Sequence, residues 1–368
     1  MVDLIFSPSF GNKPSSLVGR NSIMKELCDS LNSLPGSRER VRLIVGQRGM
    51  GKTVLLLELA DYARNNGYIV ASPTVVSSDM LERIIEKLER ECSKYLPKEK
   101  AKITGDSVGF LGFSAGIQTE YKEQAKRSFA DRLETICEKI GEEKRGVLIL
   151  IDEVHSSSEE LKKLIIAYQE MVGMKLNIAL VLAGLPFAIS QTLNQHVLTF
   201  LNRASRLTLE PISIGEIELY YQESFKKLGI ILTAEMVRGA AKFTEGSPYL
   251  MQLVGHYLTV ASSPDKPLSE KEFNNALDIA KKEFVRDICE TTIAPLSEKD
   301  VEFIKAMAQD KNGSSMKDIS LRLGVDSSYA NRYRTRLIQA DIIRQKRRGF
   351  VEFAVPYLRD YLYENKVD

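Results

Sequence analysis

The segment that most constrains this chain is a glycine-rich stretch, Gly46-Gln47-Arg48-Gly49-Met50-Gly51-Lys52-Thr53. It matches the pattern Gly-x-x-x-x-Gly-Lys-Ser/Thr in full, and it stands between a strand-like apolar run and an apolar stretch with helical spacing. In that setting the glycines let backbone N–H groups surround phosphate oxygens, and the positive end of the helix dipole adds to the attraction. The pattern therefore predicts a phosphate-binding loop.

The last two residues of this loop have specific expected roles. Lys52 should reach the β- and γ-phosphates of a nucleotide, and the Thr53 hydroxyl should bind Mg²⁺. The sequence thus predicts ATP or ADP, with Mg²⁺, as ligands. The residues expected to surround the phosphates are Gly46, Gln47, Arg48, Gly49, Met50, Gly51, Lys52, Thr53 and Val54.

A second motif places two carboxylates, Asp152 and Glu153, directly after the apolar run Val147–Ile151. The carboxyl ends of strands are where α/β sheets bind ligands. We expect Asp152 to hold Mg²⁺, directly or through water, and Glu153 to orient and polarise the attacking water. His155 follows closely, but an isolated histidine is more often a structural hydrogen-bond partner than a catalyst.

The order of apolar patterns predicts an α/β fold with a parallel sheet covered by helices, followed by a helical lid and a small basic C-terminal unit. Residues 98–120 read as an inserted glycine-broken hairpin without recognisable chemistry. Strands are expected at 41–45, 68–71, 147–151 and 178–183, and core helices at 54–62, 80–95, 130–140 and 161–172. Lid helices are expected at 214–227, 233–244, 249–261 and 270–285, and the three parts at 1–210, 211–292 and 293–368.

Composition excludes several other classes of protein. The 368 residues are 43% hydrophobic and 27% charged with a net charge of +2, as in an ordinary globular protein of two or three domains. No apolar run approaches the roughly 20 residues of a membrane span, and no secretory leader is visible. The four cysteines form no metal-binding pattern, so we expect buried reduced thiols, no zinc and a cytoplasmic protein.

A short strap, Leu17-Val18-Gly19-Arg20, precedes the phosphate loop. Together with the loop and the Asp-Glu pair it resembles the AAA+ and STAND superfamilies of P-loop ATPases, notably their Orc1/Cdc6-like and archaeal-ATPase groups. The resemblance implies that Val18, Gly19 and Arg20 contact the adenine and ribose side of the nucleotide. The alternative is an ordinary loop-to-helix turn capped at Asn21.

The same resemblance implies an arginine that acts between subunits. Arg203 and Arg206 precede the last core strand, where related ATPases place an arginine that projects towards the γ-phosphate of a neighbouring subunit. Arg206 is the first choice, since it stands immediately before the strand-like Leu207-Thr208-Leu209. This role implies a homo-oligomer, whereas the alternative is pairing with surface acids.

Two departures from the AAA+ pattern indicate a slow ATPase. The run Ala179–Gly184 ends without the polar sensor residue that many relatives carry there. Gly246-Ser247-Pro248-Tyr249 is similar to the lid motif and implies that Pro248 lies at the nucleotide, but Tyr249 replaces the frequent arginine. A slow nucleotide switch is therefore expected. More narrowly, the whole chain resembles a group of bacterial ATP-binding proteins, which implies domain order and nucleotide binding but no biological role.

The C-terminal part has the rhythm of a winged helix-turn-helix. Gly324 marks the turn, Asp326 or Ser327 caps the next helix, and 343–353 reads as a basic hairpin. Between Ala330 and Gly349 there are seven basic residues and one acidic residue. The residues expected to contact double-stranded DNA are Ser327, Ser328, Asn331, Arg332, Arg334, Arg336, Lys346, Arg347 and Arg348.

The sequence therefore favours a DNA-binding protein switched by ATP hydrolysis to ADP and phosphate. A second hypothesis is a STAND-like signalling or scaffold ATPase, in which the winged helix docks on protein. A third is a nucleotide-binding module without useful turnover.

Overall fold

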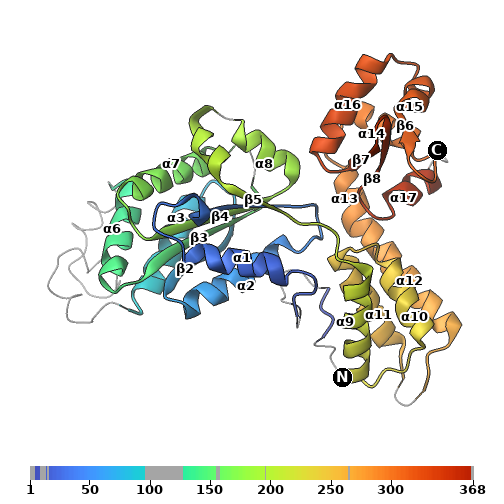
Figure 1. Cartoon of the computed structure of the whole chain (residues 1–368), viewed down its shortest axis with the longest axis horizontal. Helices are drawn as coiled ribbons and strands as arrows, with labels where there is room; N and C mark the ends of the chain where they lie inside the picture. The colour runs from blue at the N-terminus through green and yellow to red at the C-terminus, as the bar shows by residue number, and fades with distance from the viewer. Residues whose placement is uncertain are drawn as a thin grey trace.

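The computed structural model describes residues 5–8, 14, 16–95, 127–154, 158–194, 196–263 and 266–365, except for the side chains of residue 73 and residues 196–199. Figure 1 shows an α/β unit on one side, and a helical unit with a small C-terminal unit on the other. His155 and the whole of the proposed insertion at 98–120 lie outside the described residues.

The α/β unit is built on one parallel sheet. Its strands are β1 (Val41–Val45), β2 (Tyr68–Val75), β3 (Gly146–Asp152), β4 (Ile178–Gly184) and β5 (Ser205–Thr208), in the spatial order β2-β3-β4-β1-β5. The predicted parallel sheet is thus confirmed. Because β4 alone separates β1 from β3, the segments that follow β1 and β3 meet at the same edge of the sheet.

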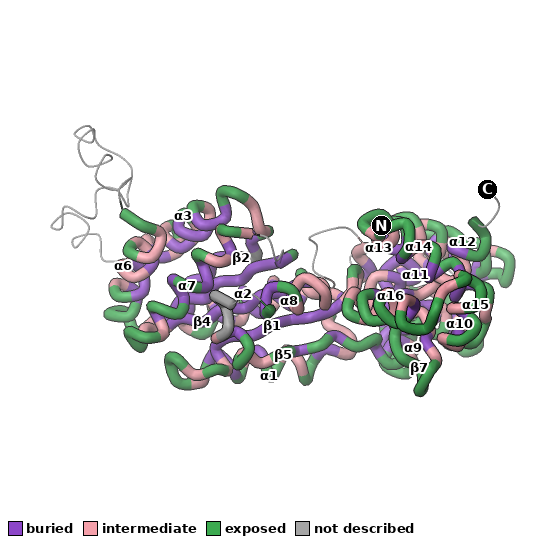
Figure 2. The backbone as a smooth tube through the Cα atoms, turned by 90° about the horizontal axis from the view of Figure 1, so that it is seen from above, coloured by how far each residue is buried: buried purple, intermediate pink, exposed green. Residues whose placement is uncertain are grey.

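Helices cover both faces of this sheet. Residues of α1 (Asn21–Leu31) and α2 (Lys52–Asn65) form a core with one set of strand residues, such as Leu148. Residues of α3 (Met80–Cys92), α6 (Phe129–Glu142) and α7 (Glu159–Gly173) pack with the alternate set, such as Ile149. The central strands β3 and β4 are therefore buried along their whole length, as expected of a parallel sheet covered on both faces, and β4 appears purple in Figure 2.

α1 begins at Asn21, where the alternative interpretation of the strap placed a helix start, but its N-cap is Arg20 and no side chain caps it. The short helix α8 (Pro186–Leu193) and the 3₁₀ segment His196–Arg203 were not predicted. α8 begins with proline at its first position, where the missing N–H costs nothing. The prediction that all four cysteines are buried is wrong for Cys28, which lies half-exposed on α1.

The four predicted lid helices are confirmed as α9 (Ile214–Lys227), α10 (Ala234–Phe243), α11 (Pro248–Ala261) and α12 (Glu270–Phe284). Each begins with a serine or threonine whose hydroxyl accepts a backbone N–H of the first turn. α12 continues without a break through the π-helical turn Val285–Glu290 into α13 (Thr291–Ile293). The lid is thus joined to the C-terminal unit by one continuous helical path.

The C-terminal unit contains α14 (Glu298–Met307), α15 (Met316–Leu323), α16 (Ser327–Gln339) and α17 (Leu358–Glu364). Its strands β6 (Ser314–Ser315), β7 (Ile343–Arg347) and β8 (Phe350–Phe353) form an antiparallel sheet in the order β6-β8-β7. Gly324 ends α15 in the left-handed conformation, and the Asp326 side chain caps α16. The predicted helices and basic hairpin are present.

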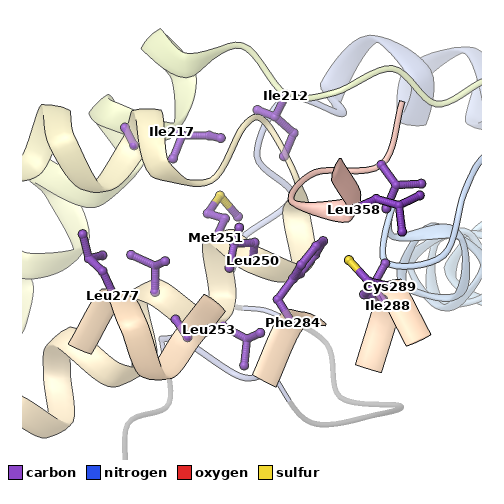
Figure 3. Close-up of a cluster of buried hydrophobic side chains, with 14 of the residues drawn as sticks. Ile212, Ile217, Leu250, Met251, Leu253, Leu277, Phe284, Ile288, Cys289 and Leu358 are labelled. Atoms are coloured by element: carbon purple, nitrogen blue, oxygen red, sulfur yellow. The ribbon is translucent and has the colours of Figure 1, made fainter. Parts of the chain in front are cut away.

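The lid and the C-terminal unit share one hydrophobic core. Figure 3 shows Phe284, Ile288 and Cys289 beside Leu358 of α17. The Tyr357 hydroxyl also donates a hydrogen bond of 2.6 Å to the Phe243 carbonyl in the lid. The lid and the C-terminal unit are therefore packed directly against each other. Within the described ranges, none of the helices has the length and apolar character needed to cross a bilayer.

Candidate active site

The loop between β1 and α2 has the conformation of a phosphate cradle. Gly49 and Gly51 have φ values of 74° and 85°, which side-chain-bearing residues adopt at a cost. Gly49 is also tightly packed, since a Cβ atom there would lie 3.1 Å from the Tyr249 Cβ. α2 begins at Lys52, so its unpaired N–H groups face the loop.

Lys52 lies folded over this loop. Its Nζ donates hydrogen bonds to the carbonyl oxygens of Gly46 at 2.8 Å and Gln47 at 2.7 Å. Burial disfavours the ammonium form and lowers the pKa of Lys52 to about 8, an effect that the nearby Asp152 partly offsets. A bound phosphate would supply the negative charge that this buried cation lacks.

The two proposed magnesium ligands already lie together. The Thr53 hydroxyl donates a 2.5 Å hydrogen bond to Oδ2 of Asp152, whose residue is only 5% exposed. A hydroxyl beside a carboxylate is an all-oxygen donor set suited to Mg²⁺. The next residue, Glu153, has a positive φ of 53°, an uncommon conformation that clusters at functional sites. Its carboxylate is exposed and lines the cavity.

A cavity of about 440 Å³ opens beside these residues, within the size range of small-molecule sites. The phosphate loop and the carboxylates form one end, and the strap and lid form the other. Two buried donors among its lining residues, Arg20 Nη2 and Gln252 Nε2, have no hydrogen-bond partner among the described residues. Buried donors of this kind need a partner, and a nucleotide offers acceptors to both.

The strap forms one wall of this cavity. Val18 and Arg20 line it, and Arg20 is only 6% exposed. Burial lowers the pKa of Arg20, although Glu216 and Glu210 act in the opposite direction. Gly19 does not line the cavity; a Cβ there would lie 2.8 Å from Ile212. Arg20 is the N-terminal flank of α1, so the strap is also the start of a helix.

The lid forms the opposite wall. Pro248 lines the cavity, and the Tyr249 backbone N–H donates to the Gly49 carbonyl at 3.2 Å. The Tyr249 hydroxyl donates to Oδ2 of Asp287 at 2.7 Å; burial and this carboxylate both raise the tyrosine pKa. Where related ATPases carry an arginine, this lid therefore holds a neutral hydroxyl paired with an acid.

Asp287, Ile288 and Thr291 also line the cavity, and the sequence analysis missed them. They lie in and just after the π-helical turn, a local irregularity that often occurs at functional sites. It has no sequence pattern of its own. At the end of β4 the lining residues are Gly184, Leu185 and, on α8, Ala188, so the expected lack of a polar sensor side chain holds there.

Most of the other loop residues predicted at the phosphates line the cavity, namely Arg48, Gly49, Met50, Gly51, Lys52, Thr53 and Val54. Gly46 and Gln47 do not. The Gln47 side chain instead donates a hydrogen bond to the backbone carbonyl of Asp341, in the turn between α16 and β7. Burial raises the pKa of Asp341. The phosphate loop is therefore in direct contact with the C-terminal unit.

Arg203 and Arg206 lie away from the cavity and are exposed. Arg206 lies on β5, opposite Leu43 of β1. Neither arginine side chain forms a hydrogen bond or ion pair with the described residues, so the alternative of pairing with surface acids is not seen there.

The basic C-terminal residues differ in how they are bound within the unit. Ser327, Ser328 and Asn331 are exposed on the N-terminal half of α16. Arg336 is held by the buried Asp300, with a shortest nitrogen–oxygen distance of 2.5 Å. Arg334 donates to Gln345 at 2.6 Å, and Lys346 pairs with Glu352 at 3.2 Å. Arg336 is therefore the least available for an external ligand.

The side chains of three arginines of the same set form no hydrogen bond or ion pair with the described residues. Arg332 lies over the Tyr329 ring at 5.6 Å, and Arg347 lies over the Phe350 ring at 4.0 Å. Arg348 is exposed at the tip between β7 and β8. Their charges remain free to meet phosphate groups.

Two parts of this chain match known protein families. Residues 16–181, somewhat under half of the chain, match the family described as AAA ATPase domain. Residues 286–362 match a domain family of unknown function, DUF8462. No curated protein matches the chain.

Two solved structures share the fold over nearly the whole chain. The Walker-type ATPase PABY2304 of Pyrococcus abyssi has 16% identity and a TM-score of 0.64, covering 97% of this chain and 99% of its own. The ORC2 protein of Aeropyrum pernix, in ADPNP–ADP complexes, has 16% identity and a TM-score of 0.64, covering 97% of this chain and 95% of its own. At this identity the likeness concerns the fold.

Proposed function

We propose that this chain, an ATPase of the AAA+ P-loop type by its matched domain and its fold, is a slow ATP-driven switch that binds double-stranded DNA through a C-terminal winged helix. The observation that carries the switch is the hydrogen bond from Gln47 of the phosphate loop to the Asp341 carbonyl of the C-terminal unit. The phosphate loop thereby contacts both the nucleotide cavity and the C-terminal unit, which is proposed to bind DNA.

The cavity supports ATP binding and hydrolysis. Lys52 and the N-terminus of α2 would hold the β- and γ-phosphates, and Thr53 and Asp152 would hold Mg²⁺, which neutralises charge on the transferred phosphoryl group. Glu153, exposed at the cavity, would orient and polarise the water. The ORC2 structure contains ADPNP and ADP, which supports an adenine nucleotide here.

Slow turnover is proposed because two usual aids to hydrolysis are missing from the cavity wall. β4 ends in residues without polar side chains, and Tyr249 takes the place of an arginine. Each absent donor would otherwise stabilise charge in the transition state, an effect of about 10²-fold or more for one well-placed donor. Arg206, with Arg203 as the second choice, would supply such a donor from a neighbouring subunit of a homo-oligomer.

The C-terminal unit supports duplex binding. Its helix–strand–helix–helix–hairpin order, with three antiparallel strands, supports the proposal of a winged helix. The exposed N-terminal half of α16, with Ser327, Ser328 and Asn331, would enter the major groove. Arg332, Arg347 and Arg348 would meet phosphates, with Arg334 and Lys346 at the flanks.

A second candidate function is docking on protein, as in STAND-like ATPases. It is favoured by the pairing of Arg336 with Asp300 and of Lys346 with Glu352, because charges already paired within the unit attract phosphates less. The aromatic pair Tyr329–Tyr333 on α16 has ring centroids 5.0 Å apart, and it would suit contact with the surface of a partner protein.

A salt titration of duplex binding separates the two candidates. The full chain and its Arg347→Ala/Arg348→Ala variant would be titrated with a fluorescent duplex, with ATP or ADP present. A plot of the logarithm of the binding constant against the logarithm of the salt concentration has a negative slope. Loss of two phosphate contacts should make that slope shallower by about 1.8. Arg38→Ala/Arg90→Ala, two exposed arginines of the α/β unit, is the control. If the wild type binds no duplex at low salt, protein docking becomes the better proposal.

A further inference from the structure

The side-chain amide of Gln252, on α11, has one end fixed and the other end free. Its Oε1 accepts a hydrogen bond of 2.9 Å from the backbone N–H of Ser7. Since only the oxygen end can accept an N–H, this contact sets the direction in which the amide faces. Its Nε2 is buried and has no partner among the described residues.

The residue itself is only 7% exposed, and it lines the nucleotide cavity. A buried donor without a partner is unfavourable, because it has lost its hydrogen bonds to water. A ligand acceptor in the cavity would remove that cost.

The N-terminal segment that orients Gln252 is anchored in the lid. The Phe6 ring packs against Tyr220 and Phe225, with centroids 5.6 and 5.4 Å apart. Gly255 lies one turn beyond Gln252 on α11 and leaves room for the Phe6 ring. A Cβ atom at position 255 would lie 2.2 Å from Phe6 Cδ1. Ser7 is therefore held at a defined place, and so is the amide that it contacts.

The position of Gln252 along α11 places it away from the phosphates. α11 begins against the phosphate loop, where the Tyr249 N–H contacts the Gly49 carbonyl. Gln252 is about one turn further on, and one helical turn advances about 5.4 Å. Apolar strap residues Leu17 and Val18 line the same cavity. The part of a nucleotide expected at this end is the base.

We propose that Gln252 is the residue that recognises the base, donating from Nε2 to a ring nitrogen of adenine and accepting the adenine amino group at Oε1. The oxygen has a second lone pair beyond the one used by Ser7. This inference rests on the proposed nucleotide binding. It adds a residue of the lid to the strap residues that were expected to contact the adenine and ribose.

The fixed direction of the amide explains why adenine would be preferred. On its N6/N7 edge adenine presents a donor beside an acceptor, which is the pattern that a glutamine amide matches, whereas guanine presents two acceptors there. On the N1 edge the ring nitrogen of adenine accepts, whereas that of guanine carries a proton. With the phosphates held by the loop and the amide held by Ser7, guanine mismatches at either edge.

The test compares dissociation constants for several nucleotides on the full chain by calorimetry. The wild type should bind ATP at least about tenfold more tightly than GTP, and either 7-deaza-ATP or 1-deaza-ATP should bind about tenfold more weakly than ATP. Gln252→Met, which keeps the length without the amide, should abolish both differences. Gln222→Met, the same change at an exposed glutamine of α9 outside the cavity, should retain them.

Several results would overturn the inference. One is equal wild-type affinity for ATP, GTP and both deaza analogues, a comparison that does not depend on whether any variant folds. Another is an unchanged ATP-to-GTP ratio in Gln252→Met. If the wild type binds none of these nucleotides, the proposed function fails as well. If it binds ATP but shows either of the first two results, only the assignment of Gln252 fails.

Discussion

Gln47 in the phosphate loop donates a side-chain hydrogen bond to the backbone carbonyl of Asp341, 294 residues further along the chain. Lys52 lies in the same loop, six residues after Gly46. The negative charges of Asp152, Glu153 and Asp341 each act to raise its pKa, against the larger lowering caused by burial. The loop that would hold phosphates is thus linked to the turn that leads into β7. A change in the loop has a direct route to the C-terminal unit.

Gln47→Ala removes the only donor in this link and should loosen the C-terminal unit from the phosphate loop. Hydrogen–deuterium exchange should become faster in the segment around residues 341–347, while exchange in the central strands stays the same. Asn66→Ala is the matched control, since that amide donates to the Tyr62 carbonyl within its own exposed helix end. Identical exchange in Gln47→Ala and wild type would show that the contact holds nothing in place.

Lys52→Ala should weaken ATP binding by at least about tenfold, because a hydrogen bond to a charged group contributes about 1.5–3 kcal/mol. The fold should persist, since within the described part of the chain the Lys52 side chain bonds to carbonyls of its own loop alone. Calorimetric titration with ATP measures the effect, and Lys305→Ala, an exposed lysine of α14, is the control. Unchanged affinity would remove the phosphate-loop assignment.

Glu153→Gln should leave ATP affinity nearly unchanged and reduce phosphate release by about 10²-fold or more, since general base catalysis contributes about 10²–10⁴-fold. The reason is that Glu153 acts on water and not on the bound nucleotide. Glu159→Gln, at the exposed start of α7 where it pairs with Lys162, is the control. Turnover at the wild-type rate would mean that the Glu153 carboxylate is structural.

The fold and the phosphate end of the site were predictable because they depend on local patterns. Val41–Val45 and Val147–Ile151 are apolar runs that meet turn residues, and the helix after Gly51 has a clear apolar period. Such patterns report secondary structure and its order. The parallel sheet and the adjacency of Thr53 to Asp152 follow from that order.

The remaining part of the site depends on contacts between distant segments. Ser7 meets Gln252 and Gln47 meets Asp341 only after the lid and the C-terminal unit have packed. Gln252 belongs to no motif, and the phosphate-loop motif gives Gln47 no role towards the C-terminal unit. The π-helical turn around Asp287 likewise follows from packing and not from a local pattern.

The proposed role of Arg206 in a neighbouring subunit predicts that ATPase activity per molecule rises with protein concentration. Arg206→Ala should remove this rise and lower the maximal rate by about 10²-fold. Arg38→Ala, an exposed arginine beside Glu39, should behave as wild type, and Arg203→Ala tests the second choice. Concentration-independent activity of a monomer would exclude action between subunits.

The most direct test of the central claim is the affinity of the full chain for duplex DNA, measured at one low salt concentration with ATP and then with ADP. The Glu153→Gln variant keeps the bound ATP intact during the measurement. Coupling between sites is typically worth about 5- to 150-fold, so the two dissociation constants should differ by at least about fivefold. Gln47→Ala should reduce that difference. Equal affinity in the two nucleotide states, or no binding in either, would contradict a nucleotide-switched DNA-binding protein.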